Sequence, residues 1–184
     1  MSSVKFQRTV RLKDGRTCIL RNGVYADGAA ALDVFLRTHE QTDYLLSYPD
    51  EITFTAEEEG RFLQDKTESA NEIELVAEVD GEIVGLGGIE AVGKNEKVRH
   101  RAEFGVSVLR SFWNNGIGHA LLDSCIERAK KAGYAQLELT VVSENAAALA
   151  LYLKAGFTEC GRNPKGFCSR LTGDQETVQL RLEL

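Results

Sequence analysis

The sequence lacks most of the features that would place it outside the ordinary globular class. It contains only two prolines, Pro49 and Pro164, so Pro-rich linkers are absent. No stretch approaches the run of about 20 apolar residues that crosses a membrane. The segment MSSVKFQRTVRLKDG at the start has no apolar core of the signal-peptide type. We therefore expect a soluble, cytoplasmic protein with no membrane partner.

Metal-ligand patterns and an excess of basic charge are also missing. The four cysteines are widely spaced, no C-x-x-C occurs and no two histidines lie close together, which is typical of free thiols rather than a metal site or a disulfide framework. The formal net charge of −6 disfavours binding to nucleic acid, which needs a basic surface. We expect no metal and no nucleic-acid partner.

The hydrophobic pattern predicts one domain of mixed α and β structure. The length of 184 residues suits a single domain. The dipeptides Asp14-Gly15 and Asp80-Gly81 each lie between two strand-like segments and predict hairpins. Helices are expected from Asp27 to about His39, with Ala30, Val34 and Leu36 on one face, and after Thr55, which forms a T-x-x-E capping box with Glu58.

The second half of the chain alternates strands and helices. The pattern predicts strands over 98–109, 135–142, 157–162 and 176–184, helices over about 115–131 and 145–155, and a polar loop over 165–174. A strand–helix–strand crossover makes its two strands parallel neighbours in the sheet. We therefore expect a three-layer α/β/α sandwich on a mixed sheet.

Two glycines, Gly116 and Gly118, stand where the helix expected over 115–131 begins. The first turn of a helix carries unpaired N–H groups and favours anions, and glycine lets a phosphate oxygen approach the amides. The two glycines therefore suggest a pyrophosphate-binding turn. A tight strand–helix connection would explain them equally well, and neither the P-loop nor the dinucleotide-binding pattern is present.

A second motif decides between these interpretations. The segment W-N-N-G-I-G at 113–118 is followed by N-A-A-A-L-A-L-Y-L-K-A-G-F at 145–157. Together they resemble the GNAT superfamily of N-acetyltransferases, whose members carry [QR]-x-x-G-x-[GA] and N-x-x-A-x-x-x-Y-x-x-x-G-F at this separation. The resemblance covers about residues 72–162, and Trp113 departs from the usual Gln or Arg.

The resemblance implies a fold and a role for each segment of the chain. It implies a mostly antiparallel sheet of about seven strands, with a V-shaped splay between the fourth and fifth core strands. A single domain over 1–184 would place acceptor-side elements at about 1–70, the acetyl-CoA-binding core at about 72–162, and a C-terminal loop and strand at 163–184. The co-substrate would be acetyl-CoA, without a metal.

The resemblance also implies which residues bind this co-substrate. The strand segment 106–108 would pair with the pantetheine arm, and the turn before the helix would hold the phosphates. Asn145, which also suits a helix N-cap, would contact the pantetheine region. The full set is Val106, Ser107, Val108, Trp113, Asn114, Asn115, Gly116, Ile117, Gly118, His119, Asn145 and Tyr152.

Two residues are candidates for the chemistry. In the family a tyrosine at the position of Tyr152 reaches the sulfur of the cofactor, where a phenol can protonate the departing thiolate. Glu103, a charged residue in an apolar strand, would take a proton from the amine if burial raised its pKa. A packed aromatic ring at Tyr152 and a rim position or an ion pair with Arg101 at Glu103 are the structural alternatives.

The resemblance implies that the acceptor is a primary amine, either a small molecule or a protein N-terminus. Within the segment EQTDYLLSYPDE at 40–51, Asp43, Tyr44 and Tyr48 are candidates for binding it together with Glu103, although a solvated loop would look the same. A homodimer is compatible with the sequence. The competing function is a non-catalytic acyl-CoA-binding sensor or regulatory module of the same fold.

Overall fold

The computed structural model describes residues 6–184 and places every strand in one sheet. The sheet has eight strands in the order β1-β2-β3-β4-β5-β6-β8-β7. The strands are β1 (Gln7–Arg11), β2 (Thr17–Asn22), β3 (Ile73–Val79), β4 (Glu82–Ala91), β5 (Arg101–Val108), β6 (Gln136–Val142), β7 (Thr158–Ser169) and β8 (Gly173–Glu183). Only the β5–β6 pair is parallel. The sheet is therefore mixed and mostly antiparallel, as expected, with eight strands instead of about seven.

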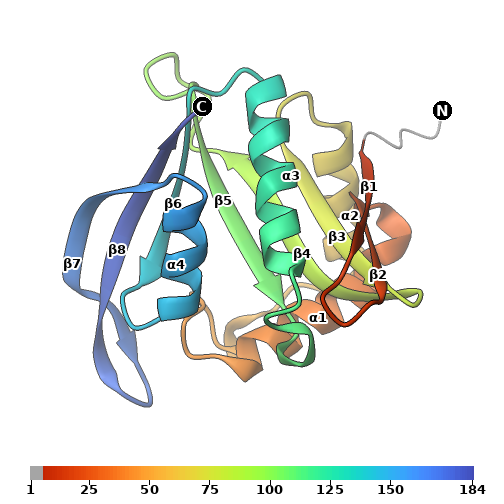
Figure 1. Cartoon of the computed structure of the whole chain (residues 1–184), viewed down its shortest axis with the longest axis horizontal. Helices are drawn as coiled ribbons and strands as arrows, with labels where there is room; N and C mark the ends of the chain where they lie inside the picture. The colour runs from red at the N-terminus through yellow and green to blue at the C-terminus, as the bar shows by residue number, and fades with distance from the viewer. Residues whose placement is uncertain (1–5) are drawn as a thin grey trace.

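Helices cover both faces of the sheet and complete the three layers. The helices are α1 (Gly28–Gln41), α2 (Ala56–Glu68), α3 (Ile117–Lys131) and α4 (Ala146–Lys154), with short 3-10 turns at Tyr25–Asp27, Pro49–Glu51 and Arg110–Phe112. In Figure 1, α3 and α4 lie in front of the sheet, whereas α1 and α2 lie behind it. The expected three-layer sandwich is confirmed.

Local sequence signals explain where several elements begin and end. Gly15 and Gly81 adopt positive φ in the two expected hairpin turns. The hydroxyl of Thr55 accepts a hydrogen bond from the Glu58 amide, and Glu58 accepts one from the Thr55 amide, which completes the capping box at the start of α2. At the start of α4, the side chain of Asn145 accepts a hydrogen bond from the Ala148 amide.

The pairing between β5 and β6 ends soon after it starts. Arg101, Ala102 and Glu103 pair with Gln136, Leu137 and Glu138, and beyond these residues the two strands have no register partners on each other. By contrast, β5 pairs with β4 along its length as far as Val108. The parallel strands therefore diverge, as the resemblance implied. Figure 1 shows the widening gap between β5 and the neighbouring β6, with α4 in front of it.

The C-terminal region differs from the sequence-based prediction. The polar segment over 165–174, expected to be a loop, belongs to a long hairpin in which β7 reaches Ser169 and β8 starts at Gly173. Its residues are mostly exposed, and β7 is an edge strand with no buried alternation to reveal it. The register of the hairpin shifts between Asn163 and Phe167, where Pro164 and Gly166 lie.

Two smaller predictions were also wrong. Ala30 is exposed, and the buried face of α1 carries Ala31, Val34, Thr38 and His39. The strand expected over 98–109 starts only at Arg101, because residues 98–100 belong to a turn closed by backbone bonds from Val98 and Arg99 to the Asn95 carbonyl. Both errors are shifts of one to three residues, the scale at which pattern-based boundaries fail.

The core lies between the sheet and its helices and holds α3 firmly. On α3, Leu121, Leu122, Cys125 and Ala129 are buried, while Ile126 is half-buried. All four cysteines are free, and Cys160 and Cys168 are exposed. Across residues 6–184, no helix has the length and apolar character that a membrane crossing requires.

Candidate active site

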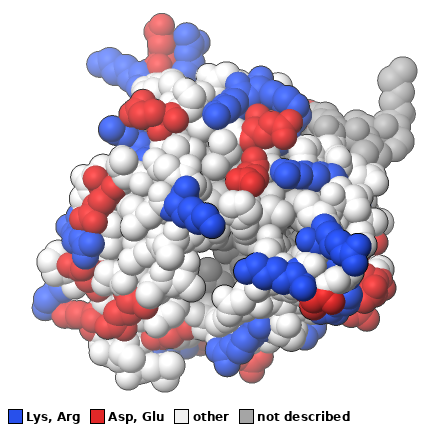
Figure 2. Space-filling view, viewed as in Figure 1, with Lys and Arg blue, Asp and Glu red and all other residues white. Residues whose placement is uncertain are grey.

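A pocket opens where β5 and β6 diverge, and we call it the splay pocket. It has a volume of about 520 Å³ and is lined by the end of β5, the turn before α3 and the first turn of α4. Figure 2 shows a hollow near the centre of this face, with Lys and Arg side chains beside it. Of the residues predicted to bind the cofactor, the lining includes Val106, Ser107, Val108, Trp113, Asn114, Gly116, Ile117, Gly118, His119 and Asn145.

The turn before α3 leaves a row of backbone amides unpaired. Asn114 has a φ of 58° and Gly116 a φ of 100°. Among the described residues, no hydrogen bond is donated by the backbone amides from Asn114 to His119, and Ala120 is the first to donate, to the Gly116 carbonyl. Successive unpaired amides at a helix N-terminus form a concave site that binds anions. The turn can therefore hold a phosphate group.

The two glycines of this turn have different roles. Gly116 needs its conformation, because a positive φ of 100° is strained for other residues. Gly118 lies inside the first turn of α3, and a Cβ placed there would have only the Leu151 side chain within 4 Å, at 3.9 Å. Its missing side chain therefore leaves open space in the splay pocket, beside the unpaired amides.

Asn115 holds the turn against the β1–β2 hairpin. Its Oδ1 accepts a hydrogen bond from the Asp14 amide at 3.0 Å, and its Nδ2 donates to Asp14 Oδ2 at 2.6 Å. Its carbonyl accepts a bond from the Lys13 amide. Asn115 is buried and absent from the lining of the splay pocket, so its side chain positions the turn and does not face the pocket.

Trp113 bridges the turn and the end of β5. Its indole N–H donates to the Val108 carbonyl at 2.6 Å, and the Arg110 guanidinium lies over its ring. Trp113 therefore still supplies a hydrogen-bond donor at the position where the family pattern has Gln or Arg. The backbone of β5 from Phe104 onward has no strand partner on the side of β6, which leaves an edge that an extended ligand can join.

Three further side chains lie at the margins of the splay pocket. His119 is exposed, with its Nε2 3.2 Å from Asp123 Oδ2. Lys13 and Glu144 also line the pocket, and the sequence reasoning missed both. Lys13 lies on the β1–β2 hairpin that Asn115 fixes, so a cation from a distant part of the chain stands beside the phosphate-binding turn. The position of Lys13 beside this turn follows from the contact between Asn115 and the β1–β2 hairpin, which the sequence alone does not show.

Tyr152 lies behind the splay pocket. The residue is 7% exposed, and its ring packs against Phe104 and Phe157 at centroid distances of 6.2 and 5.7 Å. Burial raises the pKa of its phenol to about 12. Tyr152 does not line the splay pocket, but it lies four residues after Ala148, which does. Residues four apart share a helix face, so the ring continues the face that α4 presents to the pocket.

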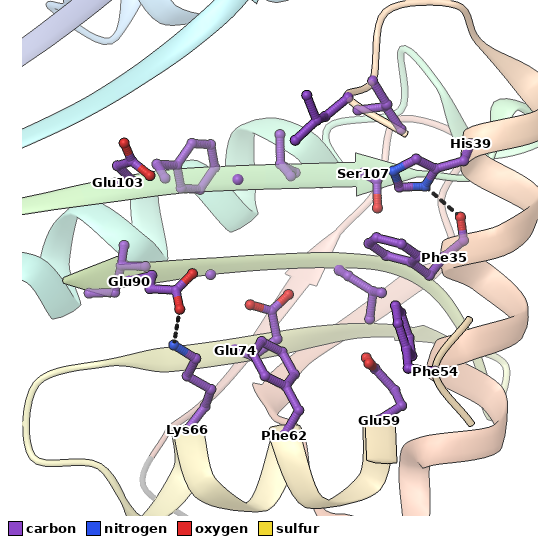
Figure 3. A pocket seen from close by; sticks show the side chains of 18 of the residues that line it. Phe35, His39, Phe54, Glu59, Phe62, Lys66, Glu74, Glu90, Glu103 and Ser107 are labelled. Carbon is purple, nitrogen blue, oxygen red and sulfur yellow. Dashed lines mark hydrogen bonds and ion pairs between the residues drawn. The ribbon is translucent and has the colours of Figure 1, made fainter. Parts of the chain in front are cut away.

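A second pocket lies behind the sheet, between α1, α2 and the strands β3 to β5. We call it the carboxylate pocket; its volume is about 570 Å³. Figure 3 shows glutamates from several elements around it, together with the aromatic rings of Phe35, Phe54 and Phe62. Val106, Ser107 and Leu45 line both pockets. The two pockets therefore meet at β5, where a group held in one can reach a group held in the other.

Glu103 lines the carboxylate pocket, but its side chain is exposed. The condition of burial is therefore not met, and the rim position named as the structural alternative is the one observed. Arg101 does not pair with it, because the Arg101 guanidinium binds Glu138 at 2.6 and 2.9 Å across the last paired step of β5 and β6. Glu103 stands at the rim of the pocket, with solvent access.

Two further carboxylates of this pocket, the buried Glu59 and the half-buried Glu74, come from other elements, and the sequence reasoning missed them. Burial raises the pKa of Glu74 on β3 to about 8, with a further contribution from the charge of Glu59. Burial also raises the pKa of Glu59 on α2. Lys66 binds Glu72 at 2.9 Å and Glu90 at 3.1 Å. Helical spacing on α2 places Glu59 and Lys66 on the inner face with Leu63, a signal that the pattern contained.

His39 is a further missed group in this pocket. Its Nδ1 donates to the Phe35 carbonyl at 2.7 Å, which leaves Nε2 as the acceptor of the neutral ring. Burial lowers the pKa of His39, although the bond to Phe35 acts in the opposite direction. His39 and Ser107 line the same pocket, as Figure 3 shows. A neutral imidazole therefore stands near the junction of the two pockets.

Of the residues expected to bind the acceptor, Asp43 and Tyr48 contact the β7–β8 hairpin. Asp43 accepts hydrogen bonds from Ser169, from Gln175 at 3.2 Å and from the Tyr48 hydroxyl at 3.2 Å. Asp43 and Tyr48 line neither pocket, and Tyr44 lines the splay pocket. The segment 40–51 thus attaches to the β7–β8 hairpin through its acidic and aromatic side chains, and contributes Leu45 and Leu46 to the carboxylate pocket.

Neither a metal site nor a reactive thiol is apparent at the junction. Within residues 6–184, no group of three or more His, Cys, Asp or Glu side chains is placed to hold a metal ion. Cys125 is fully buried on α3, and burial raises the pKa of its thiol well above the ordinary value. This environment is typical of an inert core thiol.

Comparisons with known proteins agree with this geometry. The chain matches the model of the acetyltransferase (GNAT) family over residues 33–157. The L-amino acid N-acetyltransferase AaaT of Escherichia coli (strain K12) is 36% identical over 93 residues, which are 50% of this chain and 57% of that protein. The match therefore spans little more than half of this relative's length.

Solved structures share the whole arrangement. An acetyltransferase of the GNAT family from Streptococcus pneumoniae superposes with a TM-score of 0.87 at 30% identity, covering 91% of this chain and 99% of that one. The yncA acetyltransferase from Salmonella typhimurium, solved with its cofactor acetyl-CoA, has a TM-score of 0.79 at 21% identity, covering 91% and 94%. At that identity the second similarity is one of fold.

Proposed function

The chain belongs to the GNAT family of acetyltransferases, and we propose that it transfers an acetyl group from acetyl-CoA to a primary amine. The observation that carries this proposal is the row of unpaired amides from Asn114 to His119, which opens into the same pocket as the free edge of β5. The amides suit the pyrophosphate of coenzyme A, and the strand edge suits its pantetheine arm. Lys13 would add a positive charge beside the phosphates.

The acceptor amine would enter from the other side of β5. The carboxylate pocket meets the splay pocket at Val106 and Ser107, so an amine there can attack a thioester that lies along β5. Direct attack in a ternary complex needs both groups to be held in one orientation. The backbone groups at the end of β5 would polarise the thioester carbonyl as the tetrahedral intermediate forms. The whole chain would act as one catalytic domain.

Two proton transfers complete the reaction. Tyr152 would donate its phenolic proton to the thiolate of coenzyme A as the intermediate collapses, and a pKa of about 12 keeps the phenol protonated at neutral pH. Glu103, at the rim of the carboxylate pocket, would take the proton from the attacking amine, directly or through water. His39 is the second candidate for this base, because its neutral ring faces the same pocket.

The acetyl transfer is tested by incubating the protein with acetyl-CoA and a panel of primary amines. The readouts are free thiol and, by mass spectrometry, the acetylated amine. We expect thiol release that depends on the amine, with one acetyl group added to it. Tight acetyl-CoA binding without amine-dependent thiol release would instead indicate a sensor of the same fold. Absence of acetyl-CoA binding would contradict both.

A further inference from the structure

Glu59 is a buried carboxylate without a partner. It is 7% exposed, lines the carboxylate pocket and, among the described residues, forms no side-chain hydrogen bond or ion pair. Figure 3 shows its side chain directed from α2 into the pocket, towards the sheet. Buried charges are normally paired, since an unpaired one loses its hydration without compensation. The residue is therefore expected to serve a ligand that the structure does not contain.

Glu74 faces the same space from the sheet. Its register partner on β4 is Gly88. A Cβ added to Gly88 would lie 1.9 Å from Glu74 Oε2, so the carboxylate occupies the space that any other residue at position 88 would fill. Like Glu59, Glu74 forms no side-chain hydrogen bond or ion pair with the described residues. Two unpartnered carboxylates therefore border one end of the pocket.

Lys66, a cation in the lining of the carboxylate pocket, already has ion-pair partners. Lys66 lines the pocket, but its Nζ binds Glu72 and Glu90 at 2.9 and 3.1 Å and lies over the Phe62 ring. Glu59 and Glu74 are not among its ion-pair partners. The two carboxyl groups are thus left without a cation, and a positively charged ligand bound between them would favour their ionised forms.

A row without side chains leads from these carboxylates to β5. Glu74 is paired with Gly88, and Gly88 is paired with Gly105. Residues in register point to the same face of a sheet, so Gly88 and Gly105 form a bare strip without side chains. The Glu74 carboxylate lies over its Gly88 end, while Gly105 has nothing within 4 Å of its absent Cβ and precedes Val106, where the two pockets meet. The open part of the strip therefore spans about one strand spacing, roughly 5 Å.

We propose that Glu59 and Glu74 bind a second cationic group of the acceptor, so that the acceptor is a short aliphatic diamine or a molecule with an equivalent pair of cations. One amino group would lie at Val106 and attack the thioester, while the other would lie between the two carboxylates. The chain between them would cross the bare strip, beside the apolar rings of Phe35, Phe54 and Phe62. The proposal rests on the acetyl-transfer function.

The charge of the carboxylate pocket also predicts which acceptors it binds poorly. An acceptor that carries a carboxylate close to the reacting amine, such as a free amino acid, brings a further negative charge into a pocket where the charges of Glu59 and Glu90 already raise the pKa of Glu74. Lys66 cannot compensate, since its charge is already shared by two glutamates. Diamines should therefore be better acceptors than both monoamines and α-amino acids of similar length.

The test compares hexamethylenediamine, n-hexylamine and L-norleucine as acceptors, with shorter and longer diamines added to locate the best length. The variants are Glu59→Gln and Glu74→Gln, and the control is Glu57→Gln, an exposed residue on α2 outside the pocket lining. Each variant is first checked for an unchanged acetyl-CoA affinity and a cooperative thermal transition. The same amines are also titrated calorimetrically into the protein loaded with coenzyme A.

We expect the diamine to exceed the monoamine in kcat/KM by about 10- to 100-fold, the factor that a charge-assisted contact supplies. Glu59→Gln and Glu74→Gln should each reduce this preference, mainly through KM, and Glu57→Gln should leave it unchanged. Calorimetric binding of the diamine should weaken in the same two variants, whether or not turnover is observed.

Equal kcat/KM for the diamine and the monoamine would overturn the cation site while leaving acetyl transfer intact. A higher kcat/KM for L-norleucine than for the diamine would likewise overturn the cation site. If no amine is acetylated, the proposed function fails, and the calorimetric titration alone decides on the site. Diamine binding that requires Glu59 and Glu74 would support the site, and absence of such binding would overturn it.

Discussion

Asn115 and Asp14 exchange two hydrogen bonds across 101 residues of sequence, at 3.0 and 2.6 Å. One partner lies in the turn that leaves its amides free, and the other lies in the β1–β2 hairpin. The hairpin thus fixes the turn before α3 in position. The geometry of this turn therefore depends on a segment outside the two motifs by which the family is recognised.

We predict that Asn115→Ala lowers both stability and acetyl-CoA affinity. The substitution leaves the Asp14 amide without its acceptor and removes one of the donors to the Asp14 carboxylate, which keeps its bonds to Arg16. The free energy of unfolding by urea and the calorimetric Kd for acetyl-CoA measure the two effects. An unchanged Kd in a variant of reduced stability would show that the hairpin supports the fold without positioning the turn.

The pH dependence of stability should reveal Glu74. Its pKa is raised from 4.5 to about 8, so between these values the folded protein keeps a proton that the unfolded chain releases. Stability should therefore fall as pH rises through this range, with the full loss present above about pH 8. Burial is the main cause of this rise in the pKa of Glu74. The charges of Glu59 and Glu90 raise the pKa further, whereas the charge of Lys66 lowers it.

The substitution Glu74→Gln should remove this loss of stability at high pH. The variant should gain stability over wild type at about pH 9, on the order of a few kcal/mol, and show little gain at about pH 5. Urea unfolding at the two pH values measures it, with Glu57→Gln as the control. An equal gain at both values would mean that the Glu74 proton is not retained on folding.

Removal of the Tyr152 hydroxyl should slow the chemistry and spare binding. We predict that Tyr152→Phe lowers kcat by roughly 10²–10⁴, as expected for loss of a positioned acid, while the Kd for acetyl-CoA stays close to the wild-type value. Tyr134→Phe is the matched control, because Tyr134 is equally buried but lies between α3 and β6, at the end of β6 opposite to α4. Unchanged turnover in Tyr152→Phe, under conditions limited by chemistry, would assign the ring to packing alone.

The base is identified by pH–rate profiles with one accepted amine. If Glu103 removes the proton, Glu103→Gln loses rate most at neutral pH and recovers part of it at high pH, where the amine has already lost its proton. A profile that runs parallel to that of the wild type would exclude Glu103. The same recovery in His39→Gln, with its shape-matched polar side chain, would then assign the base to His39.

Much of the fold could be predicted from local signals. The turns at Gly15 and Gly81, the capping box at Thr55 and the cap at Asn145 are short-range features, and each is present in the structure. The splay pocket collects nearly all the residues predicted to bind the cofactor, because two linked motifs contain them. The long β7–β8 hairpin was missed, since an edge strand with exposed faces carries no hydrophobic alternation.

The acceptor side could not be predicted in the same way. Glu74 appears in sequence as one polar residue in a strand, and only its register with Gly88 places the carboxylate over a bare strip. Asp43 and Tyr48 have the composition of a cation-binding loop, yet they bind the β7–β8 hairpin, more than a hundred residues away. Composition cannot distinguish a ligand contact from a tertiary contact.

The central claim is that the unpaired amides before α3 hold the phosphates of acetyl-CoA. The most direct measurement is a calorimetric titration with acetyl-CoA, combined with amide chemical shifts recorded by NMR, for wild type, Gly118→Ala and Gly118→Glu. In the wild type, the amides from Asn114 to His119 should shift strongly at saturation. Gly118→Ala should fold and bind more weakly, and Gly118→Glu should fold and lose binding, because a carboxylate enters the open space beside the amides. Wild-type affinity in a folded Gly118→Glu protein, with no shift at these amides, would contradict the account.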